Sequence, residues 1–270
     1  SYSQQFNIAV EDVNESQEIF QTGQVLDVSN TWQTVTLPTD YNSMVVVLTA
    51  NYDQTSVPLV PRMRIVSENS FEVRVDRADG SSEEVAGVAL HYVVVEEGVY
   101  TSAEHGITME AVTYTSTVTD GRGSWSGESR GYSNSYDSPI VVGQVMSYND
   151  SRFSSFWAHD GSRYDVPDST NLSVGKHVGE DPDNSRDEET VGYLVVETGD
   201  HDLSSMRIVA GMGSDIVRGV DTNPPYTYAL SGLTSPSTAI LSSAGMDGGD
   251  GGRPILYGPD PVTPTSINLA

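Results

Sequence analysis

Aromatic side chains set among polar residues are the first candidates for chemistry in this sequence. Trp125 lies in the run Gly-Arg-Gly-Ser-Trp-Ser-Gly-Glu, which contains no apolar neighbour, and Trp157 follows Phe153-Ser-Ser-Phe156. An aromatic ring can pack against the C–H face of a sugar while nearby polar groups bind its hydroxyls. We therefore expect carbohydrate contacts at Trp125, Trp157 and Tyr164, with a core position as the alternative for Trp157.

An acidic loop places oxygen-bearing side chains at alternate positions. It reads Asp181-Pro-Asp183-Asn-Ser185-Arg-Asp187. Carboxylate and hydroxyl oxygens at positions one, three, five and seven of a loop can surround a hard cation such as calcium. An EF-hand needs glycine at position six, where this chain has Arg186, so that motif is excluded. The sequence predicts a looser calcium site formed by Asp181, Asp183, Ser185 and Asp187, with a solvated acidic turn as the alternative.

Motifs for catalysis are missing from the sequence. The five histidines are scattered without the spacing of metal ligands, no Gly-x-Ser-x-Gly elbow precedes a helix, and no phosphate-binding loop is present. We therefore expect a protein that is not an enzyme. A polysaccharide-degrading enzyme component stays open as an alternative, because two of the 38 carboxylates can lie at the distance that glycoside hydrolysis requires.

The charge of the chain limits its partners. Lys and Arg number 13 against 38 Asp and Glu, which gives a net charge of −25. Such a surface repels nucleic acid and anionic membranes. Because no apolar run approaches the roughly 20 residues that cross a bilayer, we expect no membrane insertion. The absence of cysteine and the abundance of Ser, Thr, Asn and Gly favour an extracellular or cell-surface location.

Short β-branched runs bounded by turn residues dominate the chain. Alternation is clearest in Phe71-Glu-Val-Arg-Val75, where one face is apolar and the other charged, as in a half-buried strand. The other predicted strands are residues 44–49, 88–95, 139–146, 191–196 and 238–241. The sequence predicts an all-β fold of tandem antiparallel β-sandwich units with very little helix.

The strand motifs recur at a nearly constant period. Residues 43–47 (SMVVV) are repeated as 138–142 (SPIVV) and again as 237–241 (STAIL). Residues 92–98 (YVVVEEG) return as 193–199 (YLVVETG), each after a Glu-Glu pair. A period of about 95 residues suits one small sandwich per repeat. We therefore expect the corresponding segments to occupy equivalent positions in successive units.

A third element relates the two ends of the chain. Residues 6–12 (FNIAVED) look like the continuation that 267–270 (INLA) needs, and 172–175 (LSVG) occupies the same place in the middle unit. The predicted organisation is therefore a closing half-unit at 1–23, sandwich units at 24–100 and 101–199, and a partial unit at 200–270. The first and last segments then close on each other, or pair with neighbouring molecules.

The repeated unit resembles the H-type lectin domain over residues 31–96, and more weakly over 130–199. Residues 31–38 (TWQTVTLP) are similar to its entry strand, 70–75 (SFEVRV) to its Gly-Phe-x-Val strand, and 88–95 to its closing strand. Ser70 replaces the glycine before Phe71, and the family's closing Trp is missing. The resemblance implies a six-stranded antiparallel sandwich that binds galactose-type sugars, usually as a trimer.

Two functions of different classes follow from these patterns. The leading expectation is a non-catalytic, extracellular, lectin-like repeat module that binds a polysaccharide or glycan. The alternative is a structural repeat of an adhesin stalk, surface layer or extracellular filament, assembled head to tail through its terminal strands.

Overall fold

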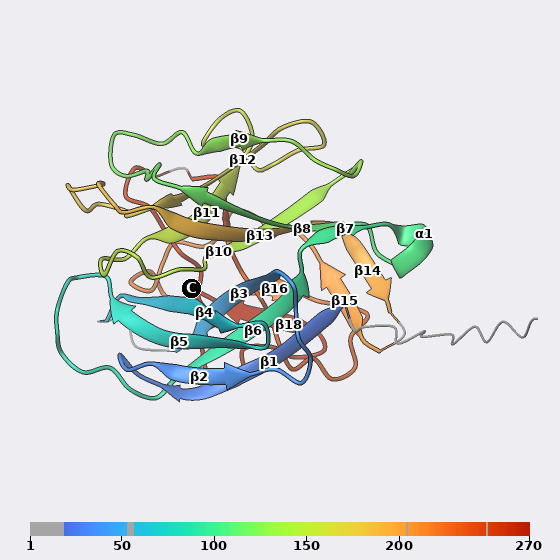
Figure 1. Cartoon of the computed structure of the whole chain (residues 1–270), viewed down its shortest axis with the longest axis horizontal. Helices are drawn as coiled ribbons and strands as arrows, with labels where there is room; N and C mark the ends of the chain where they lie inside the picture. The colour runs from blue at the N-terminus through green and yellow to red at the C-terminus, as the bar shows by residue number, and fades with distance from the viewer. Residues whose placement is uncertain (1–18, 53–56, 204, 247) are drawn as a thin grey trace, which may run out of the picture.

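The computed structural model describes residues 19–52, 57–203, 205–246 and 248–270, and almost every regular element in it is a β-strand (Figure 1). The single helix among these residues, α1 (Ser102–His105), is one turn long. None of the described helical structure is long and apolar enough to cross a membrane. The prediction of an all-β fold with very little helix is confirmed.

The first sandwich consists of six strands in two antiparallel sheets. They are β1 (Phe20–Val28), β2 (Gln33–Thr36), β3 (Met44–Asn51), β4 (Leu59–Ser67), β5 (Ser70–Arg77) and β6 (Val88–Glu96). The inner sheet has the order β1-β6-β3 and the outer sheet β2-β5-β4. In β5, Phe71, Val73 and Val75 are buried while the alternate charged residues are partly exposed, so the predicted alternation is present.

The second sandwich repeats this plan. Its strands are β7 (Gly98–Tyr100), β8 (Met109–Ser116), β9 (Glu128–Arg130), β10 (Pro139–Val145), β11 (Ser155–His159), β12 (Leu172–His177) and β13 (Glu189–Glu197). The inner sheet has the order β10-β13-β8-β7 and the outer sheet β17-β11-β12-β9, with β17 (Ser243–Ala244) added from the C-terminal part of the chain. In both sandwiches the last strand, β6 or β13, is the central strand of the inner sheet.

The two repeated segments found in the sequence have the same register in both sandwiches. Met44 pairs with Glu96 in the first, and Pro139 pairs with Glu197 in the second. A carboxylate then caps the turn before the strand in each case. Glu96 accepts the backbone N–H groups of Asn42 (2.8 Å) and Ser43 (2.7 Å), and Glu197 accepts those of Asp137 (2.8 Å) and Ser138 (2.9 Å). The Glu-Glu pairs differ: Glu189 begins β13 and is buried, whereas Glu83 and Glu84 are exposed and precede β6 by several residues.

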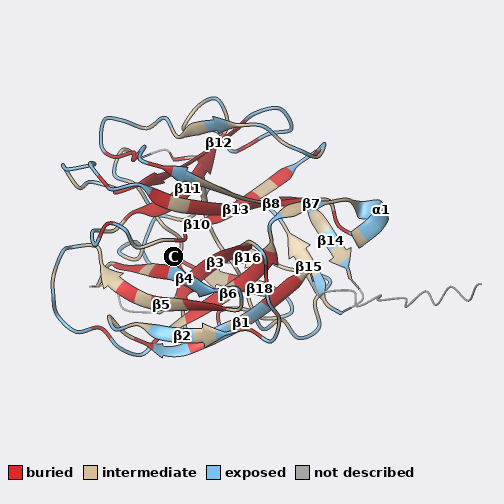
Figure 2. Ribbon diagram, viewed as in Figure 1, coloured by how far each residue is buried: buried red, intermediate tan, exposed pale blue. Residues whose placement is uncertain are grey.

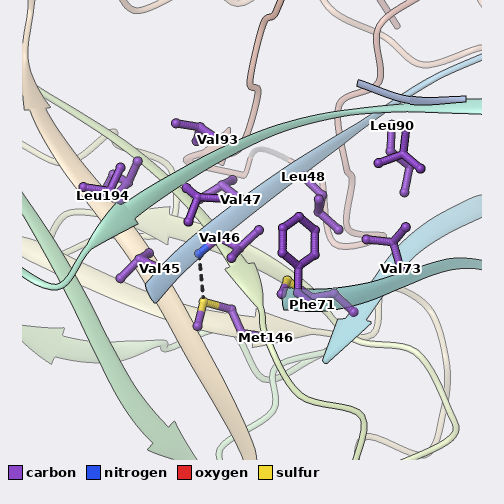
Figure 3. Packing of buried hydrophobic residues seen from close by; sticks show 14 of the residues in the cluster. Val45, Val46, Val47, Leu48, Phe71, Val73, Leu90, Val93, Met146 and Leu194 are labelled. Atoms are coloured by element: carbon purple, nitrogen blue, oxygen red, sulfur yellow. Dashed lines mark hydrogen bonds between the residues drawn. The ribbon is translucent and has the colours of Figure 1, made fainter. Parts of the chain in front are cut away.

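The two sandwiches meet at β3, which contacts β8, β10 and β13 of the second sandwich (Figures 1 and 2). Every residue of β3 from Met44 to Ala50 is buried, because one face meets the outer sheet of its own sandwich and the other meets the second sandwich. Figure 3 shows Met146 and Leu194 of the second sandwich beside Val45. Gly192 makes this approach close: a Cβ there would lie 3.2 Å from Val45 Cγ1.

The third unit is incomplete within the described residues. Its strands are β14 (Gly199–Asp202), β15 (Arg207–Ala210), β16 (Tyr226–Ala229) and β18 (Ser266–Leu269). The pair β14–β15 repeats β7–β8, and β16–β18 repeats the β2–β5 and β9–β12 pairs. Leu256 bridges Leu269 on one side and Asn51 of β3 on the other, so this sheet continues the first inner sheet. No described strand takes the place that β6 and β13 have in their sandwiches.

One strand prediction is wrong, and two of the expected unit boundaries fall within or between paired strands. Residues 238–241 form no strand, and the backbone N–H groups of Ala239 and Leu241 donate to the side chains of His91 and Thr49. The boundary expected at 23/24 falls inside β1, which starts at Phe20, and the one expected at 100/101 separates β7 from its partner β8. Residues 6–12 lie outside the described part of the chain.

We predict that the two capping carboxylates, Glu96 and Glu197, contribute equally to the free energy of unfolding. Glu96→Ala and Glu197→Ala should each lower the free energy of unfolding by about 1–2 kcal/mol, because each leaves two backbone N–H groups without their acceptor. Urea denaturation measures this. Glu188→Ala, an exposed carboxylate of the same type, is the control and should change stability by less than about 0.5 kcal/mol. If Glu96→Ala lowers stability and Glu197→Ala leaves it unchanged, the two carboxylates do not have equivalent roles.

Candidate functional site

Two of the predicted sugar contacts, Trp125 and Trp157, are brought together in the second sandwich. Their rings meet edge to face at 5.3 Å. Trp157 is completely buried in β11, and its Nε1 donates to Asp120 Oδ2 at 3.0 Å, so its ring is a core element and cannot receive a sugar. The core alternative raised for Trp157 is the one that the structure supports.

Trp125 is partly buried and lies under a glycine loop. Gly251 has φ +78°, and a Cβ there would lie 3.2 Å from Trp125 Cη2 and 2.6 Å from Gly179 Cα. Only glycine fits so close an approach in this conformation. The Gly-Asp loop that follows Met246 therefore packs onto the indole, which also lies 5.5 Å from the ring of His177.

Asp120 organises the loop that carries Trp125. Its carboxylate accepts the backbone N–H groups of Ser126 (2.9 Å) and Gly127 (3.1 Å) besides the indole N–H of Trp157. His159 stacks on Trp157 at 4.5 Å, and its Nε2 lies 3.0 Å from the carbonyl oxygen of Ser126. Asp120, Ser126 and His159 are the residue types of a hydrolytic triad. However, the histidine faces the serine carbonyl and not its hydroxyl, so the serine is not activated as a nucleophile.

His177 is buried as a neutral imidazole. Its Nδ1 accepts the Gly179 N–H at 3.2 Å, and its Nε2 lies 3.1 Å from the Gly252 carbonyl, to which it donates. Burial, and secondarily the charge of Arg253, lower the pKa of His177 to about 3. This histidine therefore fastens the glycine loop to β12 and does not act as an acid or base near neutral pH.

The third predicted sugar contact, Tyr164, stands apart from the tryptophans. It is 59% exposed, and the guanidinium of Arg163 lies 4.5 Å from its ring centroid and donates to its hydroxyl at 3.0 Å. Arg163 also donates to the carbonyl of Gly248 at 2.8 Å. Tyr164 is thus an exposed aromatic with one face covered by its own neighbour.

In the acidic loop, two of the predicted calcium ligands are paired with arginines. Asp181 Oδ2 accepts from Arg186 Nη2 at 2.7 Å, and Asp183 Oδ2 accepts from Arg152 Nη1 at 2.6 Å. The second oxygens of Asp181 and Asp183 accept backbone N–H groups of the loop itself. Among the described residues, no group of three or more acidic or histidine side chains converges as a metal site would require. The calcium prediction for Asp181, Asp183, Ser185 and Asp187 stays a prediction.

Calcium binding can be tested by melting. If the loop binds calcium, adding a chelator should lower the melting temperature by several degrees, because a ligand held only by the folded state stabilises it. Asp183→Ala should abolish the difference, whereas Asp168→Ala, in an exposed loop of the same sandwich, should keep it. Identical melting curves for the parent protein with and without chelator contradict the site.

A buried ionic network between the sandwiches was missed by sequence reasoning. Arg62 of β4 is fully buried and donates to the carbonyl oxygens of Asp150 (2.8 Å) and Arg152 (3.0 Å) in the second sandwich. Its guanidinium also lies 3.8 Å from Glu189 and 4.4 Å from the ring centroid of Tyr148. Burial lowers the pKa of Arg62, although Asp76 and Glu189 oppose the shift. Nothing in the sequence near Arg62 distinguishes it from a surface residue of an alternating strand.

An open groove in the third unit is the second feature that the sequence did not indicate. It has a volume of about 420 Å³ and is lined by Pro225, Tyr257, Gly258, Pro259, Asp260 and Asn268. Its floor is fixed by backbone hydrogen bonds from Tyr257 N to Asn268 O (3.0 Å) and from Asn268 N to Pro261 O (2.7 Å). Asn268 Oδ1 also accepts the Thr227 hydroxyl at 2.8 Å. Small-ligand sites occupy roughly 300–1,000 Å³.

The buried histidines predict a stability loss in mild acid. Burial lowers the pKa of His91 to about 4 and is the main reason for the low pKa of His177. Because the unfolded chain takes up these protons near pH 6.5 and the folded chain does not, stability is complete above that pH. Between pH 6.5 and about 4, each histidine lowers the free energy of unfolding by up to about 1.4 kcal/mol for every pH unit.

Urea unfolding at pH 7 and pH 5 measures this loss. His91→Gln and His177→Gln should each flatten the dependence on pH, since glutamine takes up no proton. An unchanged pH dependence in both variants contradicts the neutral, buried state of the two side chains.

Comparisons with family models, curated proteins and solved structures find no match to this chain. The resemblance to H-type lectins is thus carried only by the sequence motifs, and no family is assigned.

Proposed function

We propose that this chain is a non-catalytic, extracellular carbohydrate-binding module, and that the saccharide binds in the groove around Tyr257. The observation that carries the proposal is the composition of the groove. An aromatic ring and two prolines, Pro225 and Pro259, provide apolar surfaces, and Asp260 and Asn268 provide polar groups beside them. This is the combination that a pyranose needs, with C–H groups against the apolar surfaces and hydroxyls on the polar groups.

The polar groups have complementary hydrogen-bonding capacities. Asp260 is exposed and offers carboxylate oxygens, which accept from sugar hydroxyls. Asn268 offers an amide whose oxygen is already engaged by Thr227, so its nitrogen is the group that donates. Two adjacent hydroxyls can thus be bound by one acceptor and one donor. The backbone pairing of Tyr257 with Asn268 holds the groups in place before the ligand arrives, which reduces the entropy lost on binding.

The groove suits a saccharide better than the predicted tryptophan site does. Trp157 is enclosed and Trp125 lies under the glycine loop, so neither offers an open ring face beside free hydroxyl-binding groups. The groove opens outward, and its members Pro225, Pro259 and Asp260 are exposed. A shallow open site favours the end or a single residue of a glycan over a long enclosed chain.

A structural role is the second candidate, favoured by the incomplete third unit. The outer edge of β15 pairs with no described strand, whereas its counterparts β1 and β8 pair with β6 and β13. An unpaired edge can accept a strand from another molecule and so lead to head-to-tail assembly in an adhesin stalk, surface layer or filament.

Glycan-array binding tests the groove. Asp260→Ala should reduce binding at least tenfold, because a charge-assisted hydrogen bond contributes about 1.5–3 kcal/mol. Tyr257→Ala should also reduce it through the lost ring surface. Glu68→Ala, an exposed carboxylate in the first sandwich, should bind like the parent.

Two results would contradict the groove as the site. One is binding that Trp125→Ala or Tyr164→Ala abolishes while Asp260→Ala leaves it intact. The other is the lack of any glycan signal across the array for the full chain.

A further inference from the structure

We propose that a small cavity at the junction of the three units binds a monatomic anion such as chloride. The cavity has a volume of about 40 Å³. Its polar wall is formed by Thr49 and Pro61 of the first sandwich, Gln144 and Ser155 of the second, and Ser242 and Arg253 of the third unit. One buried water needs about 10–15 Å³. The cavity therefore has room for an ion slightly larger than a water molecule.

The wall of the cavity carries positive charge and no negative charge. None of the described residues that line it is Asp or Glu, although the chain has 38 of them. The guanidinium of Arg253 is the one ionised group among these lining residues. A hard metal cation requires several oxygen ligands, usually carboxylates. The charge of the wall therefore favours an anion over a cation.

Arg253 differs from the buried arginines in having no carboxylate partner within the described part of the chain. Arg62 lies near Asp76 and Glu189, and Arg186 pairs with an aspartate. Arg253 instead donates from Nε to a backbone carbonyl oxygen at 2.7 Å, and its guanidinium lies 5.9 Å from the ring centroid of Phe153. Burial lowers the pKa of Arg253. Enclosing a cation without a counter-charge is unfavourable, and a bound anion supplies that charge.

Three hydroxyl groups of the wall have protons without a good acceptor. Ser155 Oγ is buried and has no hydrogen-bond partner among the described residues. Ser242 Oγ accepts the Gly143 N–H at 3.0 Å, but the carbonyl oxygen that could accept its own proton lies 3.5 Å away. Thr49 Oγ1 accepts the Leu241 N–H at 2.9 Å and likewise lies 3.5 Å from a carbonyl oxygen. Hydroxyl hydrogen bonds to oxygen normally measure about 2.5–3.0 Å, so these protons are available to an anion.

The donors come from all three units, so an anion bound to them would hold the units together. Ser155 belongs to the second sandwich, Thr49 to the first, and Arg253 to the third unit. The net charge of −25 works against this binding, because the surrounding negative potential repels free anions. Salt screens that potential. We therefore expect a weak site that fills when the salt concentration reaches a few tenths molar.

Melting of the full chain in two sodium salts tests the site. Chloride fits the cavity, whereas gluconate, a six-carbon carboxylate, is too large for it. At about 0.5 M of either salt the general screening of charge is the same. The melting temperature in chloride minus that in gluconate should be about 2–5 °C larger for the parent than for Arg253→Gln, because an ion held only by the folded state stabilises it.

Two further variants separate anion binding from a general effect of charge. Arg122→Gln removes an arginine whose side chain is 69% exposed, and it should behave like the parent. Ser155→Ala removes one unpaired hydroxyl and should lose part of the difference between the salts. An equal difference in the parent and Arg253→Gln, or an equal loss in Arg122→Gln, overturns the site. If Arg253→Gln does not fold, an unchanged difference in Ser155→Ala overturns it.

Crystals of the parent soaked in sodium bromide locate the ion directly, because bromide scatters X-rays anomalously. An anomalous peak in the cavity beside Arg253 supports the proposal. Peaks on the surface alone, which mean an adventitious ion only, or water alone in the cavity overturn it. The cavity shares no lining residue with the groove around Tyr257, so anion binding and saccharide binding can each fail alone.

Discussion

The central strand of each inner sheet is the constraint on which the rest of the architecture depends. Strand β6 pairs with both β1 and β3, and β13 pairs with both β8 and β10. Without its central strand, each sheet would lose the backbone hydrogen bonds that hold the two flanking strands together. Most residues of both strands are also buried, because each strand lies between two neighbours in its sheet and packs its apolar side chains into the core. This explains why both strands read as near-continuous runs of Val and Leu.

Three of the 13 positively charged residues lie inside the molecule. The one lysine of the sequence, Lys176, is fully buried and donates to the Asp187 carbonyl at 3.1 Å, and the side chains of Arg62 and Arg186 are also completely buried. Burying these cations costs free energy unless every donor finds an acceptor. Here they hold together the loops that join and cover the sandwiches. Four carboxylates, Glu110, Asp120, Asp150 and Glu189, are buried as well, so the buried charges nearly cancel and the surface carries most of the net charge of −25.

The same chemistry accounts for the acidic loop and the tryptophan cluster. Arg186 and Arg152 donate hydrogen bonds to two of the carboxylates that the sequence pattern assigned to calcium. The carboxylate oxygens of Asp120 accept hydrogen bonds from loop amides and from the Trp157 indole. In both places polar atoms that could have faced a ligand are used to fix irregular backbone. The groove at Tyr257 differs, because its fixed backbone leaves Asp260 exposed at the rim. A rigid floor with an open polar edge is what preorganised recognition requires.

The class of fold and the repeat could be predicted from the sequence, because alternation of apolar residues and recurrence of strand motifs are local properties. The sequence placed 43–47 and 138–142, and 92–98 and 193–199, in equivalent positions. Which aromatic and charged residues are buried depends on contacts between segments that are distant in the sequence. Trp157, Arg62 and Lys176 lie in segments that read equally well as exposed, and they are buried because a second sheet or a distant loop covers them. The groove likewise joins Pro225 to residues more than thirty positions away, a proximity that depends on the pairing of β16 with β18 and that no local pattern encodes.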